Sequence, residues 1–263
     1  MKKPTPQPAN LAKTSGSPNL GTLAFVLLTL LATVPSFAAS NTPAASVASA
    51  SGLRFESEIQ AFARADRAQP PVPGGILFVG SSIFRQWTNV AELMSPLPVL
   101  NRAFGGSRTG EQLARFEQVV VPYAPKVIVY YCGSNDLKAD EPPDAVFERF
   151  QAFSERARQA FPETRLVFVS STRSPDRVAK WERVDHYNGL VRAYCAATPQ
   201  HTFVDINPAL YDHDGKPRLE LYRNDKLHFH PPAYVEFAAI IKPVLTRVWA
   251  EVTASGPPPP AKR

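Results

Sequence analysis

Five short apolar runs recur along the middle of the chain and alternate with longer amphipathic stretches. The runs are rich in β-branched and aromatic residues, and most of them lack a strict polar–apolar alternation. This pattern is typical of parallel strands that are buried on both faces of a sheet. The sequence therefore predicts strands at Ile76–Val79, Val99–Phe104, Lys126–Tyr131, Arg165–Ser170 and Thr202–Ile206.

The stretches between these runs have the apolar spacing of amphipathic helices. The predicted helices are Phe55–Arg67, Gly110–Val120, Asp144–Ala160, Trp181–Ala197 and Pro232–Val252. Regular strand–helix alternation favours a parallel sheet with helices on both faces. We therefore expect one α/β domain over residues 53–253, built as a three-layer α/β/α sandwich around a five-stranded parallel sheet.

Both ends of the chain differ in composition from this domain. Residues 1–38 contain lysines, an apolar run at Leu20–Val34 and a small-x-small site at Ser36–Ala38, the pattern of a signal peptide. We predict export to the periplasm or the medium, with no stable membrane insertion after cleavage, because the run is shorter than the roughly 20 residues of a spanning helix. The alternative that this segment is retained as a membrane anchor stays open. Residues 39–52 are predicted to be a disordered linker, and 254–263 a disordered proline-rich tail.

The net charge of +6 does not indicate a protein that binds nucleic acid. Five of the basic residues lie in the terminal segments, which leaves 24 basic residues against 23 acidic ones. A protein that neutralises many phosphates keeps its positive charge in the folded domain, so we expect no nucleic-acid partner. The only two cysteines, Cys132 and Cys195, lie in a strand run and a helical pattern, and are predicted to be buried free thiols.

Candidate chemistry lies in the loops after the first three predicted strands. These loops are rich in Gly, Ser and Asn, and ligands bind beyond the carboxyl ends of parallel strands. Gly75–Gly80 and Gly105–Gly110 have the G-x-x-x-x-G spacing, but no lysine follows, so neither is a P-loop. No G-x-G-x-x-G follows the first strand, and Phe84 breaks the G-x-S-x-G elbow of α/β-hydrolases.

Four sequence blocks in this order are much more specific than any one loop. They are Gly80–Ser82, Asn101–Gly106, Gly133–Asp136 and Asp225–His228. Together they resemble the signature blocks of the SGNH (GDSL-like) hydrolase family over about residues 75–252. This resemblance implies a flavodoxin-like fold with five parallel strands, and a serine ester hydrolase.

The resemblance also implies a role for each matching residue. Ser82 would be the nucleophile, and Asp225 and His228 the rest of a triad. The backbone N–H of Ser82, with Gly106 and Asn135, would form the oxyanion hole. These roles suit the residue types, because a serine hydroxyl needs a neighbouring base, and a carboxylate fixes the tautomer of that base. No metal and no organic cofactor are expected.

Several residues are rivals for these roles. Ser81 competes with Ser82, His230 competes with His228, and Asp205 ends the fifth strand where it could orient the base. Asp136 could bind a metal, although no nearby residue completes a ligand set, and Cys132 is interpreted as packing. Ser82 itself could simply cap the following helix.

Position 81 departs from the family pattern. The first block usually reads Gly-Asp-Ser, and Ser81 replaces the aspartate, with a hydroxyl that can still make a local hydrogen bond. That aspartate is not a member of the triad, so the change leaves catalysis intact but weakens any inference about the substrate from Gly-Asp-Ser relatives.

The predicted reaction is hydrolysis of a small O-acyl ester through an acyl-enzyme. Export favours O-acetyl groups on envelope or imported carbohydrate, and Arg102, Arg108 and Arg173 are candidates for binding a polar or acidic sugar. Lysophospholipase or thioesterase action is the alternative within the family. Outside it, a catalytically silent glycan-binding domain and a flavodoxin-like cofactor protein remain.

Overall fold

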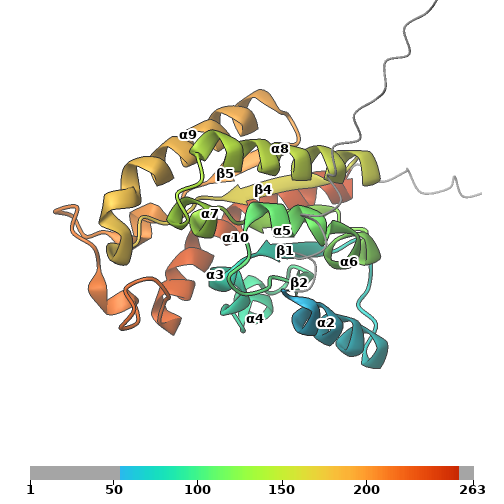
Figure 1. The fold of residues 1–263 in the computed structure, drawn as a ribbon. Helices are drawn as coiled ribbons and strands as arrows, with labels where there is room; N and C mark the ends of the chain where they lie inside the picture. Colours follow the sequence, from blue (N-terminus) through green and yellow to red (C-terminus); the bar gives the residue numbers. More distant parts are fainter. Residues whose placement is uncertain (1–53, 255–263) are drawn as a thin grey trace, which may run out of the picture. The chain divides into compact units, whose positions relative to one another are not determined.

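The computed structural model describes residues 54–254 of the chain (Figure 1). The predicted signal peptide at 1–38 and the predicted linker at 39–52 lie outside the described residues. The predicted tail at 254–263 does so too, apart from Ala254, which is the last residue of a helix.

A five-stranded parallel sheet forms the centre of the fold, as the sequence predicts. Its strands are β1 (Ile76–Gly80), β2 (Val99–Asn101), β3 (Val127–Tyr131), β4 (Arg165–Val169) and β5 (His201–Val204). The spatial order β2-β1-β3-β4-β5 is the flavodoxin-like order, whose direction reverses between β1 and β3. The carboxyl ends of these two strands are therefore where this topology places a ligand.

One face of the sheet is covered by α3 (Ser82–Arg85), α4 (Val90–Met94) and α10 (Pro231–Ala254). Alternate side chains of each strand point to this side, for example Ile76 and Phe78 of β1. They pack against the long helix α10 and a cluster of aromatic rings at its start. That cluster contains Phe84, Trp87, Phe229, Tyr234 and Phe237.

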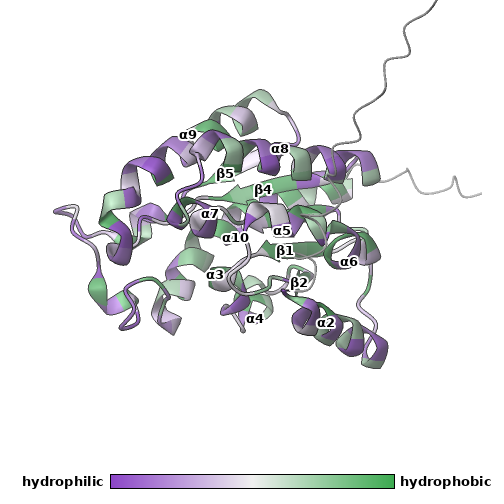
Figure 2. Ribbon diagram, in the orientation of Figure 1, coloured by the Kyte–Doolittle hydropathy of each residue, from purple (hydrophilic) through white to green (hydrophobic). Residues whose placement is uncertain are grey.

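The opposite face is covered by α2 (Glu56–Ala68), α8 (Pro143–Ala160) and α9 (Trp181–Ala197), together with the short helices α5 (Thr109–Ala114) and α6 (Phe116–Val119). Figure 2 shows hydrophobic strands enclosed by helices that carry both hydrophobic and hydrophilic residues. The buried residues of α8 and α9 are mostly apolar and recur at helical spacing, so these two helices turn an apolar stripe to the sheet, as the periodicity predicts.

Two predicted elements differ clearly from the structure, whereas the bounds of the others agree within two residues. The second strand ends at Asn101, although Arg102 N and Phe104 N still donate to Phe78 O (2.9 Å) and Gly80 O (3.0 Å) of β1. At this point the Asn101 side chain accepts a bond from Ala103 N (3.0 Å) and donates to Phe84 O (2.7 Å). The predicted helix at 110–120 is split into α5 (Thr109–Ala114) and α6 (Phe116–Val119). At the break, Arg115 leaves helical geometry and its guanidinium contacts Glu56 of α2.

Several short helices were not predicted. Each has only three to six residues, too few for a helical period to appear in the sequence. They are α3, α4, α7 (Ser134–Lys138) and the 3-10 turns η1 (Val121–Tyr123), η2 (Pro175–Lys180), η3 (Asn207–Leu210) and η4 (Leu219–Leu221).

Cys132 and Cys195 are both buried free thiols, as predicted, and burial raises the pKa of each. Within residues 54–254, no helix combines the length and the hydropathy needed to cross a bilayer.

His201, the first residue of β5, makes the stability of the domain depend on pH. Its Nε2 lies 2.8 Å from Ser154 Oγ, and burial lowers its pKa to about 4. An unfolded histidine has a pKa near 6.5, so the unfolded chain binds more protons than the folded one between about pH 6.5 and 4. The contribution of His201 is therefore complete above about pH 6.5 and is lost as the pH falls towards 4.

We expect the loss of urea stability between pH 7.5 and 5.0 to be smaller in His201→Asn than in the wild type. His213→Asn is the matched control, because the His213 side chain is 90% exposed. An equal pH dependence in His201→Asn and the wild type would contradict this assignment.

Candidate active site

The turn after β1 brings Ser82 to the carboxyl edge of the sheet. Gly80 ends β1 with φ +149°, and a Cβ at this position would lie 2.1 Å from the carbonyl oxygen of Tyr131 on β3. Only glycine fits so close to another backbone. Ser81 N then donates to Tyr131 O (3.0 Å), and Ser82 begins the short helix α3. Its hydroxyl is thus held directly beyond the junction of β1 and β3.

A tight turn before α10 carries Asp225 and His228. Two backbone hydrogen bonds close this turn, from Lys226 N to Arg223 O (2.8 Å) and from Arg223 N to His228 O (2.7 Å). Asp225 Oδ1 accepts the backbone N–H groups of Leu227 (3.0 Å) and His228 (2.9 Å). The carboxylate therefore organises the turn as well as facing the imidazole.

Ser82, His228 and Asp225 form a continuous chain of hydrogen bonds. His228 Nδ1 lies 2.6 Å from Asp225 Oδ2, and His228 Nε2 lies 3.0 Å from Ser82 Oγ. A carboxylate only accepts, so Nδ1 carries a proton, and in the neutral ring Nε2 accepts the Ser82 hydroxyl. This is the tautomer that a general base for Ser82 requires.

The Asp225 carboxylate stays ionised in this arrangement. Partial burial acts to raise its pKa, but hydrogen bonds from the His228 ring and from the backbone of His228 and Leu227 outweigh that effect and lower the pKa to about 2. The carboxylate beside the imidazole is therefore negatively charged at neutral and mildly acidic pH.

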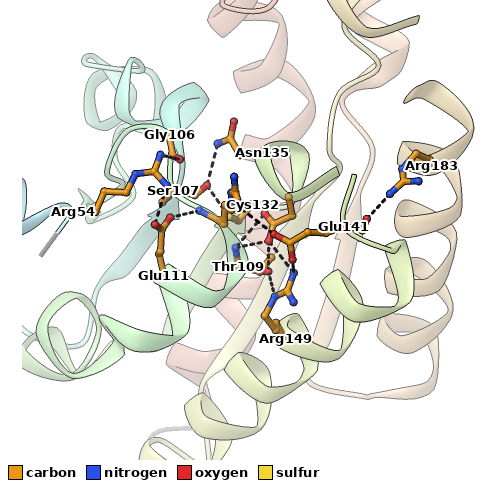
Figure 3. A network of polar contacts seen from close by, with 12 residues as sticks. Arg54, Gly106, Ser107, Thr109, Glu111, Cys132, Asn135, Glu141, Arg149 and Arg183 are labelled. Atoms are coloured by element: carbon orange, nitrogen blue, oxygen red, sulfur yellow. Dashed lines mark hydrogen bonds and ion pairs between the residues drawn. The ribbon is translucent and has the colours of Figure 1, made fainter. Parts of the chain in front are cut away.

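Gly106 lies in the loop after β2, and Asn135 lies in the first turn of α7 after β3, with Ser107 close to both (Figure 3). The Asn135 amide donates one N–H to Ser107 O (3.0 Å), which leaves its second N–H available. Gly106 has φ +73°. Within residues 54–254, the backbone N–H groups of Ser82 and Gly106 have no hydrogen-bond acceptor, so three donors remain available around the Ser82 turn.

A buried carboxylate joins these two loops. The Asp136 side chain is fully buried and accepts from Thr109 N (3.0 Å), Thr109 Oγ1 (2.6 Å) and Arg149 Nη2 (3.2 Å). Burial raises the pKa of Asp136, against the effect of the Thr109 hydrogen bonds and the Arg149 charge. Since Asn135 precedes Asp136 and Ser107 lies two residues before Thr109, this cluster sets the distance between the two loops.

A second connection ties the same loop to the Ser82 turn. Gln112 Nε2 donates to Gly80 O (3.0 Å) and to Ser107 Oγ (2.8 Å). The side chains of Gln112 and Ser107 are fully buried. Sequence reasoning assigned no role to Ser107, Thr109, Gln112 or Arg149. The signal for Arg149 was its position on the apolar stripe of α8, where a charged residue needs a buried partner.

The rival residues are not part of the Ser82 chain of bonds. Among residues 54–254, Ser81 Oγ is buried without a hydrogen-bond partner, so the local bond that its hydroxyl could make is not formed there. His230 is exposed, and Asp205 binds Ser170, Asn207 and Arg192 rather than a histidine. The Asp136 carboxylate accepts hydrogen bonds from Thr109 and Arg149. Within residues 54–254, no group of residues suited to a metal ion occurs.

The three arginines singled out for sugar binding are already paired. Arg102 contacts Asp66 and Tyr123, Arg108 pairs with Glu141, and Arg173 pairs with Asp185. Their charges are thereby balanced by protein groups.

A flavodoxin-like sheet with a serine, a histidine and a carboxylate at its carboxyl edge defines an SGNH-type ester hydrolase. The sequence profile of the GDSL-like lipase/acylhydrolase family matches residues 78–235, which include every candidate site residue. The chain belongs to this family, and it is a carboxylic ester hydrolase.

Individual relatives agree with this assignment. The chain is 27% identical to human platelet-activating factor acetylhydrolase IB subunit alpha1, over 70% of this chain and 80% of that protein. Its fold is similar to a GDSL-like lipase from Bacteroides thetaiotaomicron (TM-score 0.62, 18% identity, 72% of this chain and 97% of that one). It is also similar to a variant of Axe2, an acetyl-xylooligosaccharide esterase from Geobacillus stearmophilus (TM-score 0.56, 16% identity, 68% and 95%).

Removing the buried carboxylate should destabilise the site and the domain together. In Asp136→Ala, Arg149 loses one of its partners and Thr109 N–H is left buried without an acceptor. We expect a loss of roughly 3 kcal/mol in the free energy of unfolding, measured by urea denaturation.

Asp144→Ala is the matched control for Asp136→Ala, because the Asp144 side chain is exposed on α8 and its removal should cost less than about 1 kcal/mol. Equal stabilities of the two variants would show that Asp136 does not hold the loops.

Proposed function

We propose that this chain hydrolyses a small O-acyl ester through a covalent acyl-enzyme on Ser82. The observation that carries the proposal is the chain of hydrogen bonds from Asp225 through His228 to the Ser82 hydroxyl. In this reaction Ser82 is the nucleophile, His228 the general base, and Asp225 the group that orients and stabilises the imidazolium.

In the first half of the reaction, Ser82 Oγ attacks the carbonyl carbon of the ester while its proton moves to His228 Nε2. The carbonyl oxygen becomes an oxyanion, which accepts hydrogen bonds from the backbone N–H groups of Ser82 and Gly106 and from the Asn135 amide. The tetrahedral intermediate then collapses, and His228 gives its proton to the departing alcohol oxygen. The product is the Ser82 acyl ester.

In the second half, a water molecule attacks the acyl-enzyme carbonyl and gives a proton to His228 Nε2. Collapse returns that proton to Ser82 Oγ and releases the carboxylic acid. The ionised Asp225 stabilises the imidazolium in both halves. The reaction needs no metal or organic cofactor.

We propose an acetyl group as the acyl part and a carbohydrate as the alcohol part. An acetyl preference is supported by the similarity of this chain to an acetylhydrolase and to an acetyl-xylooligosaccharide esterase. The site is open, with the Asp225 side chain 49% exposed and His228 21% exposed, which suits an ester carried on a bulky alcohol. The Leu20–Val34 run supports an exported enzyme acting on envelope or imported polysaccharide.

The proposed nucleophile is tested with p-nitrophenyl acetate, butyrate and palmitate. The wild type should hydrolyse the short esters fastest, and Ser82→Ala should lose at least roughly 10³-fold in kcat/KM. Ser81→Ala is the matched control and should retain most of the activity, because the Ser81 hydroxyl bonds to nothing among residues 54–254.

Faster hydrolysis of the palmitate or of an acyl-thioester would favour lysophospholipase or thioesterase action and reject the acetyl proposal. If Ser82→Ala kept wild-type activity, or if only Ser81→Ala were inactive, the assignment of the nucleophile would be wrong.

The proposed role of the carboxylate is tested by Asp225→Asn. An amide in place of the carboxylate stabilises the wrong imidazole tautomer and supplies no charge, so kcat should fall by roughly 10²–10⁴-fold. Asp205→Asn is the control, since Asp205 contacts Ser170 and Arg192 and not His228. A larger loss in Asp205→Asn would reverse the assignment of the two carboxylates.

A further inference from the structure

A cavity of about 400 Å³ lies between the helix that carries Ser82 and the turn that carries His228. It is formed by residues from the end of α3, the turn that follows α3, and the start of α10. Its lining consists of Arg85, Gln86, Thr88, Asn89, Arg223, Pro231 and Tyr234. None of these residues is acidic, and two are arginines.

The guanidinium groups of the two arginines have N–H donors that bind no acceptor among residues 54–254. Arg85 pairs with Glu58 through Nε (2.8 Å), and Arg223 Nε donates to Phe229 O (2.9 Å). Within residues 54–254, the Nη atoms of both side chains have no hydrogen-bond acceptor, and Arg223 has no carboxylate partner. Arg54 and Arg108, which lie near the candidate oxyanion loop, pair with carboxylates through Nη1, whereas the ion pair of Arg85 uses only its Nε.

Both arginines are attached to the elements that carry the reacting groups. Arg85 lies one helical turn after Ser82, and its Cδ and Nη1 lie against Gly105, which directly precedes Gly106. Arg223 N donates to His228 O, so its backbone is fixed to the proposed base. The cavity therefore adjoins the two elements that carry Ser82 and His228.

We propose that this cavity binds an anionic group, a carboxylate or a phosphate, on the alcohol portion of the ester. The inference rests on the proposed function, because it assigns the alcohol side of the substrate of that reaction. Guanidinium groups bind both anions through paired N–H donors, which the Nη atoms of Arg85 and Arg223 supply. Thr88 and Asn89 add polar side chains suited to the hydroxyl groups of a sugar.

The test compares three acetate esters that differ in the charge of the alcohol. They are phenyl acetate, 4-acetoxybenzoate and 4-acetoxyphenyl phosphate. The hydrolysis of each ester is measured as the release of acetate at one fixed pH. The wild type should favour at least one anionic ester over phenyl acetate by roughly tenfold or more in kcat/KM. The preferred ester identifies a carboxylate or a phosphate as the bound group, and the preference should fall as salt is added.

Arg85→Gln and Arg223→Gln should each reduce this preference several-fold, with a smaller effect on phenyl acetate. Arg158→Gln is the matched control, because it removes one exposed arginine on α8, where Arg158 pairs with Glu155, and it should leave the ratio unchanged. If Arg223→Gln lowered all three rates equally and Arg85→Gln left the ratio unchanged, both arginines would have only structural roles and the proposal would be overturned.

The two proposals fail in different ways. Turnover of phenyl acetate without a preference for either anionic ester would overturn the anion site and leave the esterase mechanism intact. No turnover of any ester would overturn the proposed function itself.

Discussion

The close contact between the carboxyl ends of β1 and β3 is the constraint on which the candidate site depends. Gly80 has no side chain, so its Cα can approach the Tyr131 carbonyl to a distance that no other residue allows. The Gly80 carbonyl in turn accepts bonds from Phe104 N (3.0 Å) and Gln112 Nε2 (3.0 Å). One residue thus connects the Ser82 turn with the loop that carries Gly106, and the separation of these groups follows from backbone packing.

Two carboxylates near this junction show how the surroundings separate their tasks. Asp136 is fully buried, and burial raises its pKa, so its hydrogen bonds to Thr109 and Arg149 mainly offset the cost of burial. Asp225 is half exposed, and bonds from the turn and the imidazole lower its pKa to about 2. The first carboxylate is suited to holding loops together and the second to remaining charged beside a base.

The sheet and the larger helices could be predicted from the sequence because their signals are local. Buried β-branched runs and amphipathic periods determine where β1, β3, α8 and α9 lie, and the order of the blocks places the candidate residues at one edge. The helix break at Arg115 was not predictable, because it is associated with a contact with Glu56, nearly sixty residues away.

The polar contacts around the site depended still more on the folded structure. Arg102, Arg108 and Arg173 looked available in the sequence, yet each finds a carboxylate only when the chain is folded. Arg223 looked unremarkable and has no such partner within residues 54–254. Pairing of side chains far apart in sequence is a tertiary property, so a pattern of residue types cannot reveal which charges stay free.

Asp225 and His228 belong to the same four-residue turn, and that turn supplies the hydrogen bonds between them. Their relative geometry is therefore set within a short segment. The bond from His228 to Ser82 is different, since it joins positions 146 residues apart. The orientation of the base by its carboxylate is thus a local property, whereas its contact with the nucleophile depends on how the turn before α10 packs against the turn after β1.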